Sequence, residues 1–288
     1  MANRAASIHA RLLNAARTSG EDFNRLLDRF AIERWLYRLS QSDAREQFCL
    51  KGAQLFRVWL DDAPRPTRDA DFLAEGVHDL DGLRTLVQMI SRVTVNDGME
   101  FDAESVTIEE IREEASYGGV RARFIGHLGK ARLTLQLDFG FGDVITPGAA
   151  LAEFPTVLSD LPAPHLKTYP RETAFAEKLD AIAHYGMTNS RMKDYFDLYT
   201  LAGEGAIDAP TLGRAIAATF RRRGTPLPDG LPVGLTQDFA SDAAKRTQWR
   251  AFVEKSRLTA PPLEVVVDLI ATFSEGPFAM ARARQRNS

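Results

Sequence analysis

The spacing of apolar side chains predicts a mixed α/β first part and a helical second part. Over the first 40 residues, apolar positions such as Phe23, Leu26 and Phe30 recur at helical spacing and predict two helices. From residue 48 onward, short apolar runs alternate with amphipathic stretches, and three later segments have period-2 character. The predicted elements are a strand over 48–51, helices over 55–59 and 80–91, and strands over 69–74, 105–112, 120–128 and 132–139.

A proline-rich stretch separates this part from the rest of the chain. Residues 147–170 contain Pro147, Pro155, Pro162, Pro164 and Pro170 and have weak periodicity, which is typical of a crossing between domains. We therefore expect an N-terminal α/β domain with a mixed sheet over 1–165 and an α-helical C-terminal domain over 166–288. The helices predicted there cover 172–185, 190–202, 211–223, 241–257 and 261–274, and the arginine-rich end is interpreted as a frayed tail.

Composition and charge narrow the class of protein. With 44% hydrophobic residues the chain can bury a core, and its single cysteine, Cys49, lies in an apolar run and cannot form an internal disulfide. No apolar run approaches the roughly 20 residues of a membrane helix, and the N-terminus lacks an apolar signal core, so we expect a soluble, cytoplasmic protein. A net charge of −3 excludes a protein that coats nucleic acid by charge alone.

Two aspartates are the first candidates for chemistry. In the predicted strand over 69–74, Asp69 and Asp71 are two residues apart and therefore point to the same face, while Ala70 and Phe72 face the core. Magnesium in phosphoryl-transfer sites is commonly held by a few carboxylates together with substrate phosphates. The pair predicts a metal site, although a solvated strand end fits the same pattern.

A small-residue turn precedes this strand. In Lys51-Gly52-Ala53, a predicted strand passes into a helix, whose free N–H groups can receive a phosphate. These three residues are therefore candidates for nucleotide binding. The alternative is an ordinary turn in which glycine permits tight packing.

A third carboxylate ends the strand predicted over 132–139. Its apolar positions alternate with Thr134, Gln136 and Asp138, so the polar face ends in an acid. If this strand lies beside the strand of Asp69, Asp138 can complete a three-carboxylate cluster that binds a second metal ion or deprotonates the attacking hydroxyl. An exposed sheet face with Asp138 at a turn is equally compatible with the pattern.

Charged residues of the helical part form a further set. Lys178 follows Glu177 on a predicted helix and can border a cleft, where it would meet a triphosphate as a point charge. On the next helix Asp194 is three residues from Arg191, which is also the spacing of an ordinary surface ion pair.

Together these segments resemble a known family. In the order and spacing of five segments, the chain resembles the nucleotidyltransferase toxins of the AbiEii/AbiGii type. These segments are Leu50-Lys51-Gly52, Arg65 to Asp71 with Thr67 at its third position, Asp138, Glu177-Lys178, and Arg191 to Asp194. The resemblance spans residues of about 48–202. The sequence departs from the family where Ala53 and Gln54 replace a glycine and a threonine, which narrows the approach of a phosphate.

The resemblance implies a polymerase-β-like core and the role of toxin in a type IV toxin–antitoxin pair, with a cognate antitoxin as partner. It implies Mg²⁺-dependent transfer of a nucleotide from a nucleoside triphosphate to the 3′ end of an RNA, tRNA in particular. By this resemblance Asp69 and Asp71, and Asp138 with less support, are metal ligands. The resemblance also implies that Lys178 binds phosphate and that Asp194 is the acidic residue of the last matching segment, which runs from Arg191 to Asp194.

The mechanism expected is in-line attack of an RNA 3′-hydroxyl on the α-phosphate, with two Mg²⁺ ions on the three carboxylates. Basic residues such as Arg121 on a strand, or Arg221, Arg222 and Arg223 at a helix end, can hold RNA phosphates or be ordinary solvated surface. Thr67 is expected on the face of Asp69 by strand alternation. Two other hypotheses remain: nucleotidylation of a protein hydroxyl, and an inactive module that binds a partner.

Overall fold

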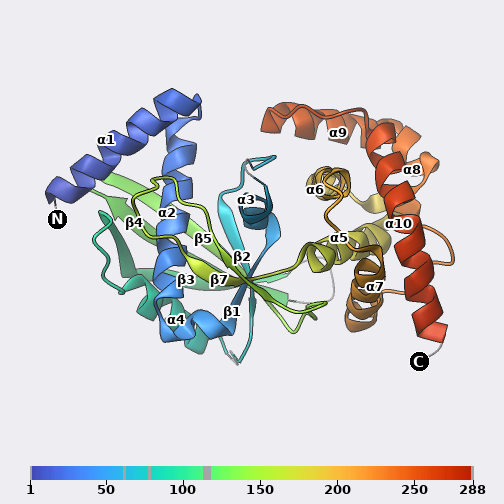
Figure 1. Ribbon diagram of the computed structural model, residues 1–288, viewed down its shortest axis with the longest axis horizontal. Coiled ribbons are helices and arrows are strands. Elements are labelled where there is room, and N and C mark those ends of the chain that lie inside the picture. The colour runs from blue at the N-terminus through green and yellow to red at the C-terminus, as the bar shows by residue number, and fades with distance from the viewer. Residues whose placement is uncertain (1, 61–62, 77–78, 113–117, 287–288) are drawn as a thin grey trace. The chain divides into compact units, whose positions relative to one another are not determined.

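The computed structural model describes residues 2–60, 63–76, 79–112 and 118–286 (Figure 1). The chain divides into two compact units. The first unit comprises residues 1–142 and 150–168, and the second comprises 143–149 and 169–288. The strand β7 (His165–Thr168) closes the first unit, so the division follows residue 168.

The first unit combines a sheet with helices. Its helices are α1 (Ala2–Ser19), α2 (Phe23–Ser40), η1 (Asp43–Gln47), η2 (Gly52–Gln54), α3 (Leu55–Trp59) and α4 (Leu80–Ser91). Its strands are β1 (Phe48–Lys51), β2 (Asp69–Ala74), β3 (Met99–Arg112), β4 (Gly118–Leu128), β5 (Ala131–Phe141), β6 (Ala150–Glu153) and β7. The strands and helices predicted before residue 142 are confirmed, with β3 beginning earlier than the alternation indicated.

The sheet is mixed, as predicted. Its seven strands follow the order β3-β4-β5-β2-β1-β7-β6. The pairs β2–β5 and β1–β7 are parallel, and the others are antiparallel. Asp138 was expected near Asp69 only if the two strands are neighbours, and β5 does lie directly beside β2.

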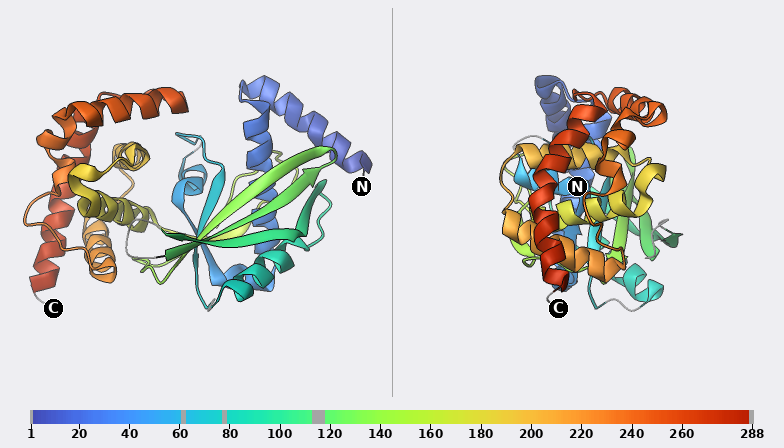
Figure 2. Two further views of the ribbon diagram at one scale, coloured as in Figure 1. Left: turned by 180° about the vertical axis from the view of Figure 1, so that it is seen from behind. Right: turned by 90° about the vertical axis from the view of Figure 1, so that its right-hand side faces the viewer.

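The apolar face of this sheet packs on helices (Figure 2). Trp35 of α2 is fully buried, and its ring centroid lies 5.9 Å from that of Phe72 on β2 and 6.0 Å from that of Phe124 on β4. Phe72 also stacks on Phe139 of β5, with ring centroids 5.5 Å apart. Because successive strand residues point to opposite faces, this packing leaves the alternate, polar positions of β2, β4 and β5 on the other face.

The proline-rich stretch, interpreted from the sequence as a crossing between domains, also contains regular structure. Two short strands form within it, and β7 pairs with β1 while β6 pairs with β7 at the sheet edge. Hydrophobic alternation over four residues is too short a pattern to distinguish such strands from a loop, and their place is decided by pairing with β1.

The second unit is helical, as predicted. Its elements are α5 (Arg171–Tyr185), η3 (Gly186–Thr188), α6 (Met192–Gly203), α7 (Ala209–Arg223), η4 (Val233–Leu235), α8 (Gln237–Ser241), α9 (Ala243–Ser256) and α10 (Leu263–Arg286). The basic end is not frayed, because α10 continues through Pro277 to Arg286, and Phe278 and Ala281 are fully buried. Residues 287 and 288 of the predicted tail lie outside the described residues.

Candidate functional site

A row of charged residues crosses the polar face of the sheet in the first unit. The sheet register pairs Lys51 of β1 with Asp71 of β2, Asp71 with Asp138 of β5, and Asp138 with Arg121 of β4. Side chains that are paired across neighbouring strands share a face of the sheet. Residues separated by 87 positions in the sequence, from Lys51 to Asp138, thus meet in one line.

Asp69 and Asp71 lie on the polar face, as the alternation predicted. Both aspartates are partly exposed, whereas Ala70 and Phe72 are 0% and 1% exposed. The partner of Asp69 on β5 is Gln136, one position along the same face from Asp138. The core therefore fixes the direction of both carboxylates, because turning β2 over would bury them and expose Phe72.

The carboxylate of Asp71 lies against the backbone of Gly52. A Cβ atom added at residue 52 would meet Oδ2 of Asp71 at 1.9 Å, and Gly52 also has a φ of +73°. Both the backbone conformation and the space occupied by the carboxylate require glycine here. The glycine of the predicted phosphate turn thus makes room for one of the two aspartates.

The rest of that turn supports β2 and forms no long helix. Residues 52–54 form a 3-10 turn, and α3 after it has only five residues, so it has little helix dipole to attract an anion. Ala53 is buried. Gln54, also buried, donates a hydrogen bond from Nε2 to the carbonyl oxygen of Asp69 at 3.0 Å. The residue that departs from the family pattern therefore holds the beginning of the aspartate strand.

Thr67 precedes β2, which begins at Asp69, so strand alternation does not decide where its side chain points. It is partly buried, and its hydroxyl lies 3.4 Å from the carbonyl oxygen of Asp69. Thr67 therefore remains close to the aspartate strand, at a position in the loop that leads into it.

Asp138 is held by an arginine. Nε and Nη2 of Arg121 donate to Oδ1 and Oδ2 of Asp138, both at 2.7 Å. The side chains are 25% and 17% exposed, which makes this a partly buried, bidentate pair. The hydrogen bond to Asp138 raises the pKa of Arg121, and the negative charge of Asp69 contributes to the same shift. Arg121 was predicted as a candidate for RNA contact, but its guanidinium lies in the carboxylate row.

The donor set of Asp69 and Asp71 fits a divalent cation. Magnesium is usually bound by one or two carboxylates and completes its shell with water and substrate phosphates. Among the described residues, no group of three or more His, Cys, Asp or Glu side chains is arranged to hold a metal ion. The fit is therefore to a two-carboxylate site, in which the carboxylate of Asp71 lies against Gly52 and Asp138 is engaged by Arg121.

The second unit contains a buried ion cluster around Lys178 of α5. Its Nζ lies 2.8 Å from Oδ1 of Asp194 and 2.8 Å from Oδ2 of Asp197, and these two aspartates of α6 are 1% and 0% exposed. Nε of Arg191 donates to the other oxygen of Asp194 at 2.6 Å. Burial opposes the ionisation of Asp194, but the positive charges of Lys178 and Arg191 outweigh it and lower its pKa. The alternative of an ordinary surface pair is therefore wrong for the two aspartates, which are buried, while Arg191 remains partly exposed.

A second cluster in this unit was not predicted. Arg223, at the end of α7, lies 3.1 Å from Asp143, 3.3 Å from Glu177 and 3.3 Å from Asp180. Burial lowers the pKa of Arg223, but the three acids outweigh burial and raise it overall. Glu177 and Asp180 lie three residues apart on α5, but Asp143 and Arg223 are remote from them in sequence, so no local pattern indicated this cluster.

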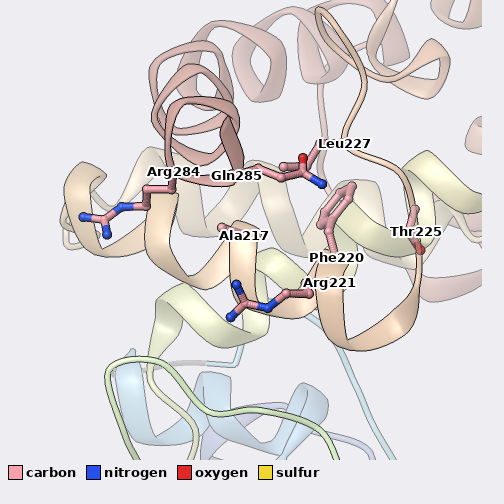
Figure 3. Close-up of a pocket in the computed structure, with 7 residues that line it drawn as sticks. All are labelled: Ala217, Phe220, Arg221, Thr225, Leu227, Arg284 and Gln285. Carbon is pink, nitrogen blue, oxygen red and sulfur yellow. The ribbon is translucent and has the colours of Figure 1, made fainter. Parts of the chain in front are cut away.

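The ends of α7 and α10 frame a small pocket (Figure 3). Its lining includes Phe220 and Arg221 of α7 and Arg284 of α10. The guanidinium groups of Arg221 and Arg284 point away from the ring of Phe220 in this view, and both side chains are exposed. The lining of this pocket contains no acidic residue, and its two arginines give it a positive charge.

The candidate residues follow one another along the chain in the order expected of the predicted family: Asp69 and Asp71 on β2, Asp138 on β5, Lys178 on α5 and Asp194 on α6. The model of the AbiEii nucleotidyl transferase toxins of type IV toxin–antitoxin systems matches residues 34–274. The chain belongs to the AbiEii family. This confirms the predicted family and supports a nucleotidyltransferase as the class of enzyme. No curated protein matches the sequence.

Solved structures share the fold of this AbiEii family member. JHP933 from Helicobacter pylori is 16% identical, with a TM-score of 0.52 over 92% of this chain and 97% of that one. A second H. pylori structure, provisionally assigned as a nucleotidyltransferase, is 16% identical, with a TM-score of 0.51 over 93% and 99% of the two chains. Within the described ranges, no helix combines the length and apolar character needed to span a membrane.

Proposed function

We propose that this AbiEii family member transfers a nucleotide from a nucleoside triphosphate to the 3′ end of an RNA, tRNA in particular, with Asp69 and Asp71 holding Mg²⁺. The observation that supports the proposal best is the position of the two aspartates, which lie on one face of β2 beside Gly52. The family membership supports the reaction class, and a polymerase-β-like core with an antitoxin partner forms part of the same proposal.

The residues of this chain have distinct roles in the proposed reaction. When bound, the cation supplies Lewis-acid stabilisation of the charge that develops on the phosphates. Asp69 and Asp71 orient it, and Gln54 fixes the backbone of Asp69 through its hydrogen bond of 3.0 Å. Lys51, the cross-strand partner of Asp71, contributes positive charge at the end of the row for an incoming phosphate. Lys178, held by two buried aspartates, is the proposed phosphate-binding lysine of the second unit.

The acceptor is proposed to be RNA because the chain offers positive charge outside the acid clusters. Arg221 and Arg284 lie at the ends of α7 and α10, where they border the pocket of the second unit. Arginine side chains of this kind contact phosphates and position an RNA without reading its sequence. The overall negative charge restricts such contacts to local surfaces.

The test is to incubate the protein with Mg²⁺, each labelled nucleoside triphosphate and total tRNA, and then to digest the product with RNase or protease. We expect label in an RNase-sensitive, protease-resistant product. Asp69→Asn and Asp71→Asn should each abolish incorporation while the melting temperature stays unchanged or rises, because crowded carboxylates repel one another. Protease-sensitive label would favour a protein acceptor, and near-normal transfer by either variant would contradict the site.

A further inference from the structure

Arg121 occupies the place beside Asp138 where a second cation would have to bind. The guanidinium engages both oxygens of the carboxylate at 2.7 Å. Register reinforces the pairing, since Arg121 and Asp138 are direct cross-strand partners on β4 and β5. Glu109, the partner of Arg121 on β3, forms its ion pair with Arg123 instead. The strongest contact of Arg121 is therefore with the carboxylate row.

We propose that Arg121 is a positioning residue that serves as a built-in cation of this row and restricts it to one tightly bound divalent cation, on Asp69 and Asp71. This inference rests on the proposed function and specifies its metal stoichiometry. It also assigns Asp138 the role of holding Arg121 in place of the ligand role expected from the sequence.

Two physical effects support this role. A bidentate arginine uses the preferred lone-pair directions of both carboxylate oxygens, so a metal ion would have to displace it to bind Asp138 in the same manner. The guanidinium also carries a permanent positive charge, which repels a divalent ion nearby. The pairing register places Arg121, Asp138 and Asp71 in one line across β4, β5 and β2, and the negative charge of Asp69 contributes to the raised pKa of Arg121.

The experiment is a titration of the full chain with Mn²⁺ alone, with free ion counted by electron paramagnetic resonance. The wild-type protein should bind one ion tightly. Arg121→Gln should bind a second ion at Asp138 and should hold the first roughly fourfold more tightly, because β4 and β2 lie two strand spacings, roughly 10 Å, apart, and a unit charge at that distance from a divalent ion still changes the affinity severalfold in water. Arg121→Lys keeps the charge and should bind one ion, as the wild type does.

Two controls separate this role from a general effect of charge or folding. Arg132→Gln removes a positive charge from the same face of β5, six residues from Asp138 and about 20 Å away, beyond the screening length. This variant should bind Mn²⁺ as the wild type does. The double variant Arg121→Gln/Asp138→Asn should lose the second ion. Melting curves establish that each variant is folded.

The outcomes distinguish the inference from the function on which it rests. If folded Arg121→Gln binds one ion with an affinity within twofold of the wild type, the role of Arg121 is overturned while the two-aspartate site stands. A wild-type protein that binds two ions tightly would also overturn it. If the wild type neither binds Mn²⁺ nor transfers a nucleotide, the proposed function fails as well.

Discussion

Replacement of Lys178 by alanine should destabilise the second unit strongly. The variant leaves Asp194 and Asp197, which are 1% and 0% exposed, without the ammonium group that lies 2.8 Å from each. Removing one partner of a buried ion pair typically costs about 3–5 kcal/mol, because the remaining charge stays buried and uncompensated. Arg191 still pairs with Asp194, so the lower end of that range, about 3 kcal/mol, is expected.

The measurement is equilibrium unfolding in denaturant, followed by circular dichroism, together with nucleotide transfer at a temperature where the variant is folded. A loss of about 3 kcal/mol corresponds to a decrease of roughly 10 °C in melting temperature for a domain of this size. Lys193→Ala is the matched control, since Lys193 is exposed on the same helix as both aspartates. Its effect should stay within about 0.5 kcal/mol. A similarly small effect of Lys178→Ala would refute the buried cluster.

A double variant separates the structural role of Lys178 from its proposed contact with phosphate. Lys178→Ala/Asp197→Asn removes one positive and one negative charge, so the cluster is again neutral and should recover at least about half of the lost stability. If Lys178 also contacts the triphosphate, transfer by this double variant should remain at least about tenfold below wild type, because a charge-assisted contact is lost. Full recovery of transfer would limit Lys178 to a structural role.

Three further predictions concern the first unit. Gly52→Ala should displace the carboxylate of Asp71, abolish transfer and cost more than the roughly 1 kcal/mol expected of the conformation alone. Gly20→Ala, at a nearly equal φ of +72° but with no atom within 4 Å, should cost only that conformational term, and equal unfolding energies for the two variants would contradict the contact. Thr67→Glu should lose transfer and toxicity, because a negative charge is added beside the aspartate strand; a fully toxic strain would separate Thr67 from the site. Burial raises the pKa of Glu33 from 4.5 to about 7, so between these pH values the folded state retains a proton that the unfolded state releases. The unfolding free energy should therefore fall by up to roughly 3 kcal/mol as the pH rises through this interval. Denaturation curves at several pH values should show this fall for the wild type and not for Glu33→Gln.

Local patterns in the sequence predicted most elements and the direction of the two aspartates. Alternation placed Asp69 and Asp71 opposite Ala70 and Phe72, since a side-chain period of two follows from strand geometry alone. The helices of the second unit were predicted in the same way from helical spacing, which also follows from local backbone geometry. By contrast, the continuation of α10 past residue 274 depends on the burial of Phe278 against neighbouring helices, which no local pattern contains.

The pairing of charges was decided by tertiary structure. The sequence offered Arg121 as a contact for RNA and Asp138 as a ligand for metal, but the register of β4 and β5 places these side chains opposite each other as a bidentate pair. Helical spacing correctly paired Arg191 with Asp194 within α6, but it did not indicate that Lys178 of α5 also reaches Asp194. Which charges meet depends on which strands and helices are neighbours, and long-range packing of the core sets those neighbours, whereas residue spacing specifies only the face on which each charge lies.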